Sequence, residues 1–131
     1  MILVDTSVWV GYFRKGENAE SLEKSITLDL ICTNEIILSE LIPALQHTRQ
    51  RELIQSLNAL PCVPYTIFWE GIRTLQVLNL TNGINKVGLR DLMIAQHCQH
   101  CLHQNLELWS LEKHFRLMVA NTSLKLFSTS T

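Results

Sequence analysis

The chain has 131 residues, a length that suits one domain, and 47% of them are apolar while only 18% are charged. Its formal charge of -1 excludes the strongly basic surface on which non-specific nucleic-acid binders depend. No apolar stretch approaches the roughly 20 residues of a membrane span, and Asp5 and Arg14 interrupt any secretory signal, so we expect a cytoplasmic protein outside the membrane.

Short apolar runs alternate with amphipathic stretches from the first residues onward. Residues 2–5 predict a short buried strand, after which Thr6 or Ser7 is expected to cap a helix over residues 8–13. Asn34 is expected to cap the helix that follows the second strand. The remaining predicted elements are helices at 19–28, 35–45, 49–60, 67–80, 89–104 and 111–119, strands at 30–33, 106–109 and 124–127, and an extended segment at 62–64.

This alternation predicts a three-layer, Rossmann-like α/β fold with a mostly parallel sheet of four to five short strands flanked by helices. Pro43 is expected to kink or end the helix that begins at residue 35. Residues 1–127 are predicted to form a single domain, and the small polar residues 128–131 a frayed tail. In such a sheet, ligands bind beyond the carboxyl ends of the strands.

Four acidic residues from distant segments are predicted to meet at that edge. Asp5 ends the first strand, Glu40 lies about two turns into the helix after the second strand, and Asp91 lies in the first turn of its helix. Glu112 follows the strand at 106–109. Two like charges about 4 Å apart repel by roughly 4 kcal/mol at an effective dielectric near 20, so such a cluster requires a positive partner. Oxygen ligands suit Mg²⁺ or Mn²⁺, and such an ion suits hydrolysis of a phosphodiester.

Each acid also has a structural explanation that the sequence alone leaves open. Asp5 is a candidate helix cap, and Glu40 stands at the edge of an apolar stripe from which it can reach solvent. Asp91 and Glu112 lie in first turns, where the helix dipole favours acids. The convergence of all four in one fold is what favours a shared site.

Four segments carry a resemblance to a known family. They are the opening ILVDTSVWVGYF, the helical LSEL, the segment VGLRDLMIAQHC and the late LWSLEKHF. On these segments the chain resembles a PIN-domain ribonuclease, and specifically a VapC-type toxin of a toxin-antitoxin pair. The resemblance extends over nearly the whole chain and implies a PIN-like domain.

The resemblance implies roles for the acids. Asp5 and Asp91 take the positions of metal-holding residues, and Glu40 that of an acid which completes the metal shell or orients the attacking water. Glu112 stands where the family usually has an aspartate, so its longer side chain is expected to act through water or on a second, more weakly held ion. His114 stands where many relatives carry a further acid and is not expected to be a ligand.

Polar neighbours are candidates for supporting roles. Ser110 falls where the family has a small hydroxyl residue, and Thr6 and Ser7 are expected to donate hydroxyl hydrogen bonds to the site or only to cap the helix. Lys86 and Arg90 flank the central aspartate and are candidates to contact an RNA phosphate, with a solvated loop charge as the alternative.

By the same likeness, the implied activity is Mg²⁺- or Mn²⁺-dependent cleavage of single-stranded RNA, leaving a 5′-phosphate and a 3′-hydroxyl without a covalent enzyme intermediate. The implied partners are RNA, a cognate antitoxin protein and a second copy of the chain in a homodimer. The helical segments 41–45 and 53–60 are the candidate surface for these protein contacts.

Other patterns compete with this interpretation. Residues 97–103, HCQHCLH, suggest zinc because Cys98 and Cys101 have CxxC spacing. No second ligand pair is evident, so a core-facing Cys98 with outward histidines is expected instead. The three tryptophans are expected in the core in preference to stacking on RNA bases.

Two other acid-dependent families fit less well. An aspartyl-phosphate phosphatase carries a second aspartate where this chain has Ser7, and a receiver-like domain needs an aspartate near residues 63–64. The stronger alternative is a PIN-like domain with impaired catalysis that acts mainly as a protein-binding module. Glu112 and the low charge content favour that alternative.

Overall fold

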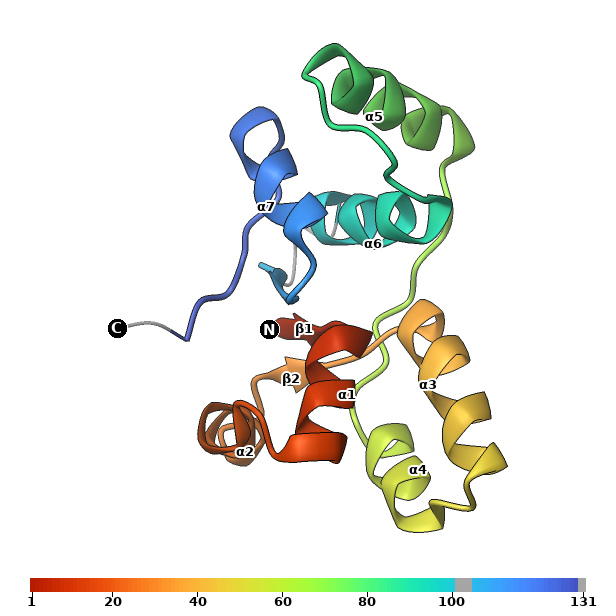
Figure 1. The fold of residues 1–131 in the computed structure, drawn as a ribbon, viewed down its shortest axis with the longest axis vertical. Helices are drawn as coiled ribbons and strands as arrows, with labels where there is room; N and C mark the ends of the chain where they lie inside the picture. The colour runs from red at the N-terminus through yellow and green to blue at the C-terminus, as the bar shows by residue number, and fades with distance from the viewer. Residues whose placement is uncertain (101–104, 130–131) are drawn as a thin grey trace.

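The computed structural model describes residues 1–100 and 105–129, which form helices around a small parallel sheet (Figure 1). The strands are β1 (Ile2–Val4), β2 (Ile31–Cys32) and β3 (Glu107–Trp109). The helices are α1 (Thr6–Lys15), α2 (Ala19–Thr27), α3 (Glu35–His47), α4 (Arg51–Asn58), α5 (Trp69–Thr81), α6 (Leu89–His100) and α7 (Lys113–Met118), and a 3₁₀ turn, η2 (Val119–Asn121), follows. The end of the helix predicted over 89–104 and the end of the predicted tail lie outside the described residues.

The sheet has the order β2-β1-β3, and both pairings are parallel. Ile2 of the central strand pairs with Ile31 on one side and with Glu107 on the other. The predicted α/β fold with a parallel sheet is therefore confirmed. Every residue of β1 and β2 is buried, which explains why both segments are short, continuous apolar runs.

The number of strands is smaller than the four to five predicted, because the described residues contain three. The segments expected at 62–64 and 124–127 each contribute one isolated parallel bridge, at Cys62 and at Leu126. Cys62 lies between Pro61 and Pro64, which have no backbone N–H and so cannot extend a ladder.

Two helices begin directly after strands and are fixed there by side-chain caps. The Oδ1 atom of Asp5 accepts the backbone N–H of Thr6 at 2.8 Å, and α1 begins at Thr6, so Asp5 is the cap and the prediction of Thr6 or Ser7 is wrong. Asn34 caps α3 as predicted, with its Oδ1 accepting the N–H of Ile37 at 3.0 Å. Both helices thus start at the carboxyl edge of the sheet.

Pro43 does not end α3, which continues to His47, so of the two predicted effects, a kink or an end, the end is wrong. A proline removes the N–H that would bond to the carbonyl four residues earlier. Here that carbonyl belongs to Ser39, an exposed residue where water can replace the lost donor. The helix therefore tolerates the proline on its solvent side.

The helices fall into two groups in Figure 1, with α1 to α4 at one end of the molecule and α5, α6 and α7 at the other. The short strands lie between the groups. None of the helices in the described part of the chain has the length and apolar character that a membrane span requires. Residues of the site come from both groups, so the sheet edge is where they meet.

Candidate active site

The carboxyl edge of the sheet carries a polar residue after each strand. Asp5 follows β1, Asn34 lies two residues after β2, and Ser110 follows β3. The backbone N–H of Asp5 donates to the carbonyl of Trp109 at 2.8 Å, which joins the ends of β1 and β3. Because the strands are parallel, these residues lie at the same edge.

Asp5 is a fully buried carboxylate. Its Oδ2 atom accepts the Ser110 hydroxyl at 2.6 Å and lies 3.4 Å from the Ser7 hydroxyl, while its Oδ1 atom accepts the Thr6 N–H and the guanidinium of Arg90. A buried charge is costly unless it is paired and hydrogen-bonded, and Asp5 is both. The apolar opening of the chain thus delivers a carboxylate to the interior with its partners in place.

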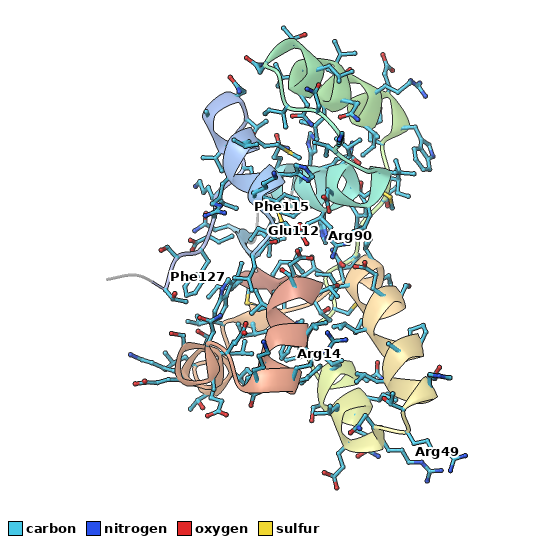
Figure 2. All side chains as sticks on the ribbon, in the orientation of Figure 1. Arg14, Arg49, Arg90, Glu112, Phe115 and Phe127 are labelled. Carbon is cyan, nitrogen blue, oxygen red and sulfur yellow. The ribbon has the colours of Figure 1, made fainter. Side chains whose placement is uncertain are left out.

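Arg90 joins three acids that are far apart in the sequence. Its Nη2 atom bonds to Asp5, its Nη1 atom donates to Asp91 Oδ1 at 2.9 Å, and its Nε atom donates to Glu40 Oε1 at 2.6 Å. Figure 2 shows Arg90 at the N-terminal end of α6, facing the start of α3. The structure therefore brings Asp5, Glu40 and Asp91 together as the sequence predicts.

The hydroxyl of Thr6 lies inside this network. It donates to Glu40 Oε1 at 2.8 Å and accepts from Arg90 Nη2 at 3.1 Å. Burial alone lowers the pKa of Arg90, but the hydrogen bond and charge of Asp5, with the bonds to Asp91 and Glu40, outweigh it and raise that pKa above its usual value. The guanidinium is a permanent cation at the centre of the acids.

One guanidinium does not neutralise three carboxylates, so two formal negative charges remain uncompensated in the network. The side chains are unequally accessible: that of Asp5 is 0% exposed, that of Asp91 16%, that of Arg90 28% and that of Glu40 39%. The cluster is thus electronegative and open to solvent on the Glu40 side.

A second bond between helices fixes the spacing of two of these acids. The side-chain amide of Asn34, at the start of α3, donates to Nδ1 of His97 on α6 at 2.8 Å. Glu40 lies six residues after Asn34, and Asp91 lies six residues before His97. Because both residues of the bond are buried, it holds α3 and α6 in register at the site.

The hydroxyls of Ser7 and Ser110 line the edge beside Asp5. They lie 3.5 Å apart, and each accepts a backbone N–H from the segment after β3: Ser7 from Leu111 at 3.0 Å and Ser110 from Glu112 at 3.1 Å. These contacts position the two hydroxyls around the carboxylate and tie the loop after β3 to the start of α1.

The outer candidates are less closely joined to the network. Glu112 is exposed, and its carboxylate has no hydrogen bond or ion pair within the described residues, although its backbone N–H binds Ser110. Lys86 is an exposed loop residue with a left-handed backbone. His114, not expected as a ligand, lies with Nδ1 3.5 Å from Asp91 Oδ2. His114 was not among the site residues expected from the sequence, although it lies beside Asp91.

The donor set suits a hard divalent cation, which prefers carboxylate and hydroxyl oxygens. Asp5, Glu40 and Asp91 supply carboxylates, and the guanidinium of Arg90 stands at their centre as a stand-in cation. With the acids spaced around Arg90, no three His, Cys, Asp or Glu side chains of the described residues are close enough together to hold an ion. The acids fit an ion in chemistry and charge, with Arg90 in the central position.

A model of the PIN domain family matches residues 2–118 of the sequence. The chain belongs to the PIN domain family. PIN domains are generally nucleases, and these nucleases generally use divalent metals. No curated protein matches the sequence of this PIN domain.

Three of the solved structures with the same fold are VapBC structures. The DNA-bound VapBC of Salmonella typhimurium contains a chain with a TM-score of 0.71 and 15% identity, covering 96% of each chain. VapBC2 of Rickettsia felis, bound to a promoter DNA fragment, matches with a TM-score of 0.70 and 21% identity, covering 99% of this PIN domain and 100% of that chain. VapBC-1 of nontypeable Haemophilus influenzae matches with a TM-score of 0.71 and 19% identity, covering 98% of each chain. At these identities the likeness shows the fold.

The competing patterns are resolved in part. Cys98 is buried as expected, but His97 is buried too, so the prediction of outward histidines is wrong for that residue. α6 buries polar residues because they have partners: Asn34 binds His97, and the backbone of Phe68 binds Gln96. Cys101, the other half of the CxxC pattern, lies outside the described residues.

The tryptophans differ in the same way. Trp9 and Trp109 are buried as predicted, at 4% and 3% exposure, but Trp69 is 51% exposed, so the expectation that it lies in the core is wrong. Trp69 is the first residue of α5, where no element covers it completely. Neighbouring Phe68, which precedes α5, is also exposed, at 58%.

Proposed function

We propose that this PIN domain is a Mg²⁺- or Mn²⁺-dependent endoribonuclease and acts as the toxin of a VapC-type toxin-antitoxin pair in the cytoplasm. The observation that carries the proposal is the convergence of Asp5, Glu40 and Asp91 on one cationic centre at the carboxyl edge of the sheet. We take residues 1–127 as a single functional domain.

The acids would have unequal roles. Asp5 and Asp91 would hold the ion, since Asp5 is held rigidly by Ser110 and Asp91 lies at the start of a well-packed helix. Glu40, the most exposed of the three, would complete the ligand set or orient the attacking water. When bound, a divalent cation supplies charge stabilisation for the phosphoryl group and activates water for attack.

The remaining residues would position these groups and the RNA. Ser7 and Ser110 would orient the buried carboxylate of Asp5 through their hydroxyl groups. Lys86 and Arg90 are the proposed contacts for phosphates of the RNA, and Glu112, at the exposed rim, would bind a second or more weakly held ion. Hydrolysis by water would leave a 5′-phosphate and a 3′-hydroxyl.

A nuclease assay with matched variants tests the proposal. Purified protein, separated from any antitoxin, should degrade RNA with Mg²⁺ or Mn²⁺ and stop with EDTA. Asp5→Asn and Asp91→Asn should each lower the rate more than about 100-fold, the upper range for loss of a residue that only supports a metal ligand. Asp29→Asn, the same change at an exposed turn, is the control and should leave the rate unchanged. Equal rates in all four proteins would mean a contaminating nuclease or a different site.

One observation favours the alternative of a catalytically impaired, protein-binding PIN domain. Arg90 already binds the three acids, and among the described residues the Glu112 carboxylate makes no hydrogen bond or ion pair with them. On that alternative, the purified protein would bind its partner but degrade no RNA with either ion. The same assay, run beside a binding measurement, separates the two functions.

A cognate antitoxin and a homodimer are the proposed partners, and the VapBC neighbours support the first. The surface expected from the sequence needs correction, because Leu41, Leu45 and Leu57 are buried in the chain's own core. What remains between α1, α3 and α4 is a cavity of about 300 Å³ whose lining includes Phe13 and Arg14 (Arg14 is labelled in Figure 2).

Sedimentation tests these partners. The chain alone should sediment as a dimer, and addition of the product of a neighbouring antitoxin gene should give a larger complex. Phe13→Ala, at the cavity, should weaken the complex. A monomer under both conditions would remove the partner proposal while leaving the nuclease proposal to the RNA assay.

A further inference from the structure

We propose that Arg90 is an internal competitor of the divalent ion: its guanidinium holds the three acids together when no ion is present and must leave them before an ion can bind. This inference rests on the proposed function, because it concerns access to the same acids. It assigns to Arg90 control of the metal affinity of the site.

The first argument is that Arg90 uses the oxygen atoms that face the centre of the cluster. It takes Oδ1 of Asp5, Oδ1 of Asp91 and Oε1 of Glu40. Of the remaining oxygens, Asp5 Oδ2 accepts the Ser110 hydroxyl at 2.6 Å and Asp91 Oδ2 faces His114. A cation placed among the three acids therefore meets the guanidinium directly, and the two positive charges exclude one another.

The second argument is that the guanidinium can leave. Its side chain is 28% exposed and Glu40 is 39% exposed, so two members of the network already reach solvent. Arg90 is partly buried, and its long side chain extends from the first turn of α6. Rotation about the side-chain bonds is therefore enough to release the guanidinium, without a change in the backbone. The Arg90–Glu40 salt bridge joins two partly exposed side chains, so water weakens it and it contributes little by itself.

The third argument concerns Asp5 after release. It would keep the N–H of Thr6 and the hydroxyl of Ser110 as hydrogen-bond donors, but it would have no cation beside a fully buried charge. The open arrangement is unfavourable by itself and becomes favourable when an ion of higher charge enters. Exchange of the guanidinium for a divalent ion is thus the transition that the geometry supports.

Metal binding measured by calorimetry tests the inference without an activity readout. The proteins are the wild type, Arg90→Gln and the control Arg73→Gln, which removes the same charge from an exposed position on α5. If the open arrangement is populated about one-tenth of the time, removing Arg90 should lower the Kd for Mn²⁺ about tenfold. Arg73→Gln should bind Mn²⁺ as the wild type does.

Thermal unfolding gives a second signature. In EDTA, Arg90→Gln should melt at a lower temperature than the wild type because three acids lose their shared cation. Saturating Mn²⁺ should raise its melting temperature more than it raises that of the wild type. An unchanged or weaker Mn²⁺ affinity in Arg90→Gln overturns the inference, since Arg90 would then organise the ligands and not compete with the ion.

Two further outcomes are distinguishable. If the wild type and Arg90→Gln both fail to bind Mn²⁺, the proposed metal-dependent function fails and this inference fails with it. If Arg90→Gln does not fold, the wild type is titrated with Mg²⁺ while the side-chain Nε–H signal of Arg90 is followed by NMR. In the metal-free protein the hydrogen bond to Glu40 should slow exchange of the Nε–H with solvent. Faster exchange on addition of Mg²⁺ is the expected result, and exchange that stays slow at saturating Mg²⁺ overturns the inference.

Discussion

The bond between Asn34 and His97 offers the sharpest test of how the fold positions the acids. Asn34 caps α3 through the N–H of Ile37 and binds His97 through its amide. Asn34→Ala removes both contacts. Loss of the cap costs about 1 kcal/mol, and leaving the buried Nδ1 of His97 without a partner costs about 1–3 kcal/mol. The free energy of unfolding should therefore fall by about 2–4 kcal/mol.

A second variant separates the two contributions. Asn34→Ser keeps an oxygen that can accept the Ile37 N–H but is too short to bind His97, so it should lose only about 1–3 kcal/mol. Urea unfolding of the two variants and the wild type measures the difference, which should be about 1 kcal/mol in favour of serine. In the alanine variant, loosened α3 and α6 should also weaken Mn²⁺ binding about tenfold, the effect of a lost residue behind a metal ligand.

Two results would refute this reasoning. A loss below about 0.5 kcal/mol in Asn34→Ala is typical of a surface substitution and would mean that the buried bond does not form in solution. Equal losses in the alanine and serine variants would mean that the cap contributes nothing to α3.

Three further predictions concern side chains that are buried or partly buried. Ser110→Ala removes a hydrogen bond to the buried carboxylate of Asp5 and should lower the unfolding free energy by about 1.5–3 kcal/mol in urea; a change below about 0.5 kcal/mol would contradict the contact. Burial lowers the pKa of His97 from its ordinary value of 6.5, so the unfolded chain binds the proton more readily and stability should fall as the pH falls below 6.5; an NMR titration midpoint above 6.5 would contradict this. Burial raises the pKa of Tyr65 to about 12 from 10.0, so stability should fall as the pH rises from 10.0 towards 12, and Tyr65→Phe should remove that loss.

The edge of the sheet was the most predictable part of the molecule. Asp5, Asn34 and Ser110 each follow a short, mostly apolar strand, and a parallel sheet gathers the ends of such strands at one edge. The meeting of these three strand ends at one edge follows from this rule. It needs no knowledge of individual contacts.

Burial along α6 could not be predicted from periodicity. The helix buries Leu92 and then every residue from Ile94 to Cys98, so its polar residues do not mark an outer face. His97 and Gln96 lie inside because residues from other segments, Asn34 and Phe68, supply hydrogen bonds. A pattern of residue types on one helix contains no information about such partners, and a prediction made from the stripe alone places these side chains in water.

Arg90 shows the same limit at the site itself. Adjacent residues on a helix point about 100° apart, so Arg90 and Asp91 are neighbours in the sequence, but their side chains are not expected to point the same way. Their contact arises because Arg90 lies in the first turn of α6, where its long side chain reaches the carboxyl edge and meets Asp5 and Glu40. The guanidinium is thus placed by the sheet that gathers the acids. Any rearrangement that brings an ion to those acids must also move the Arg90 guanidinium to a new position. An RNA phosphate at the solvent-exposed Glu40 side is the natural partner for the released guanidinium.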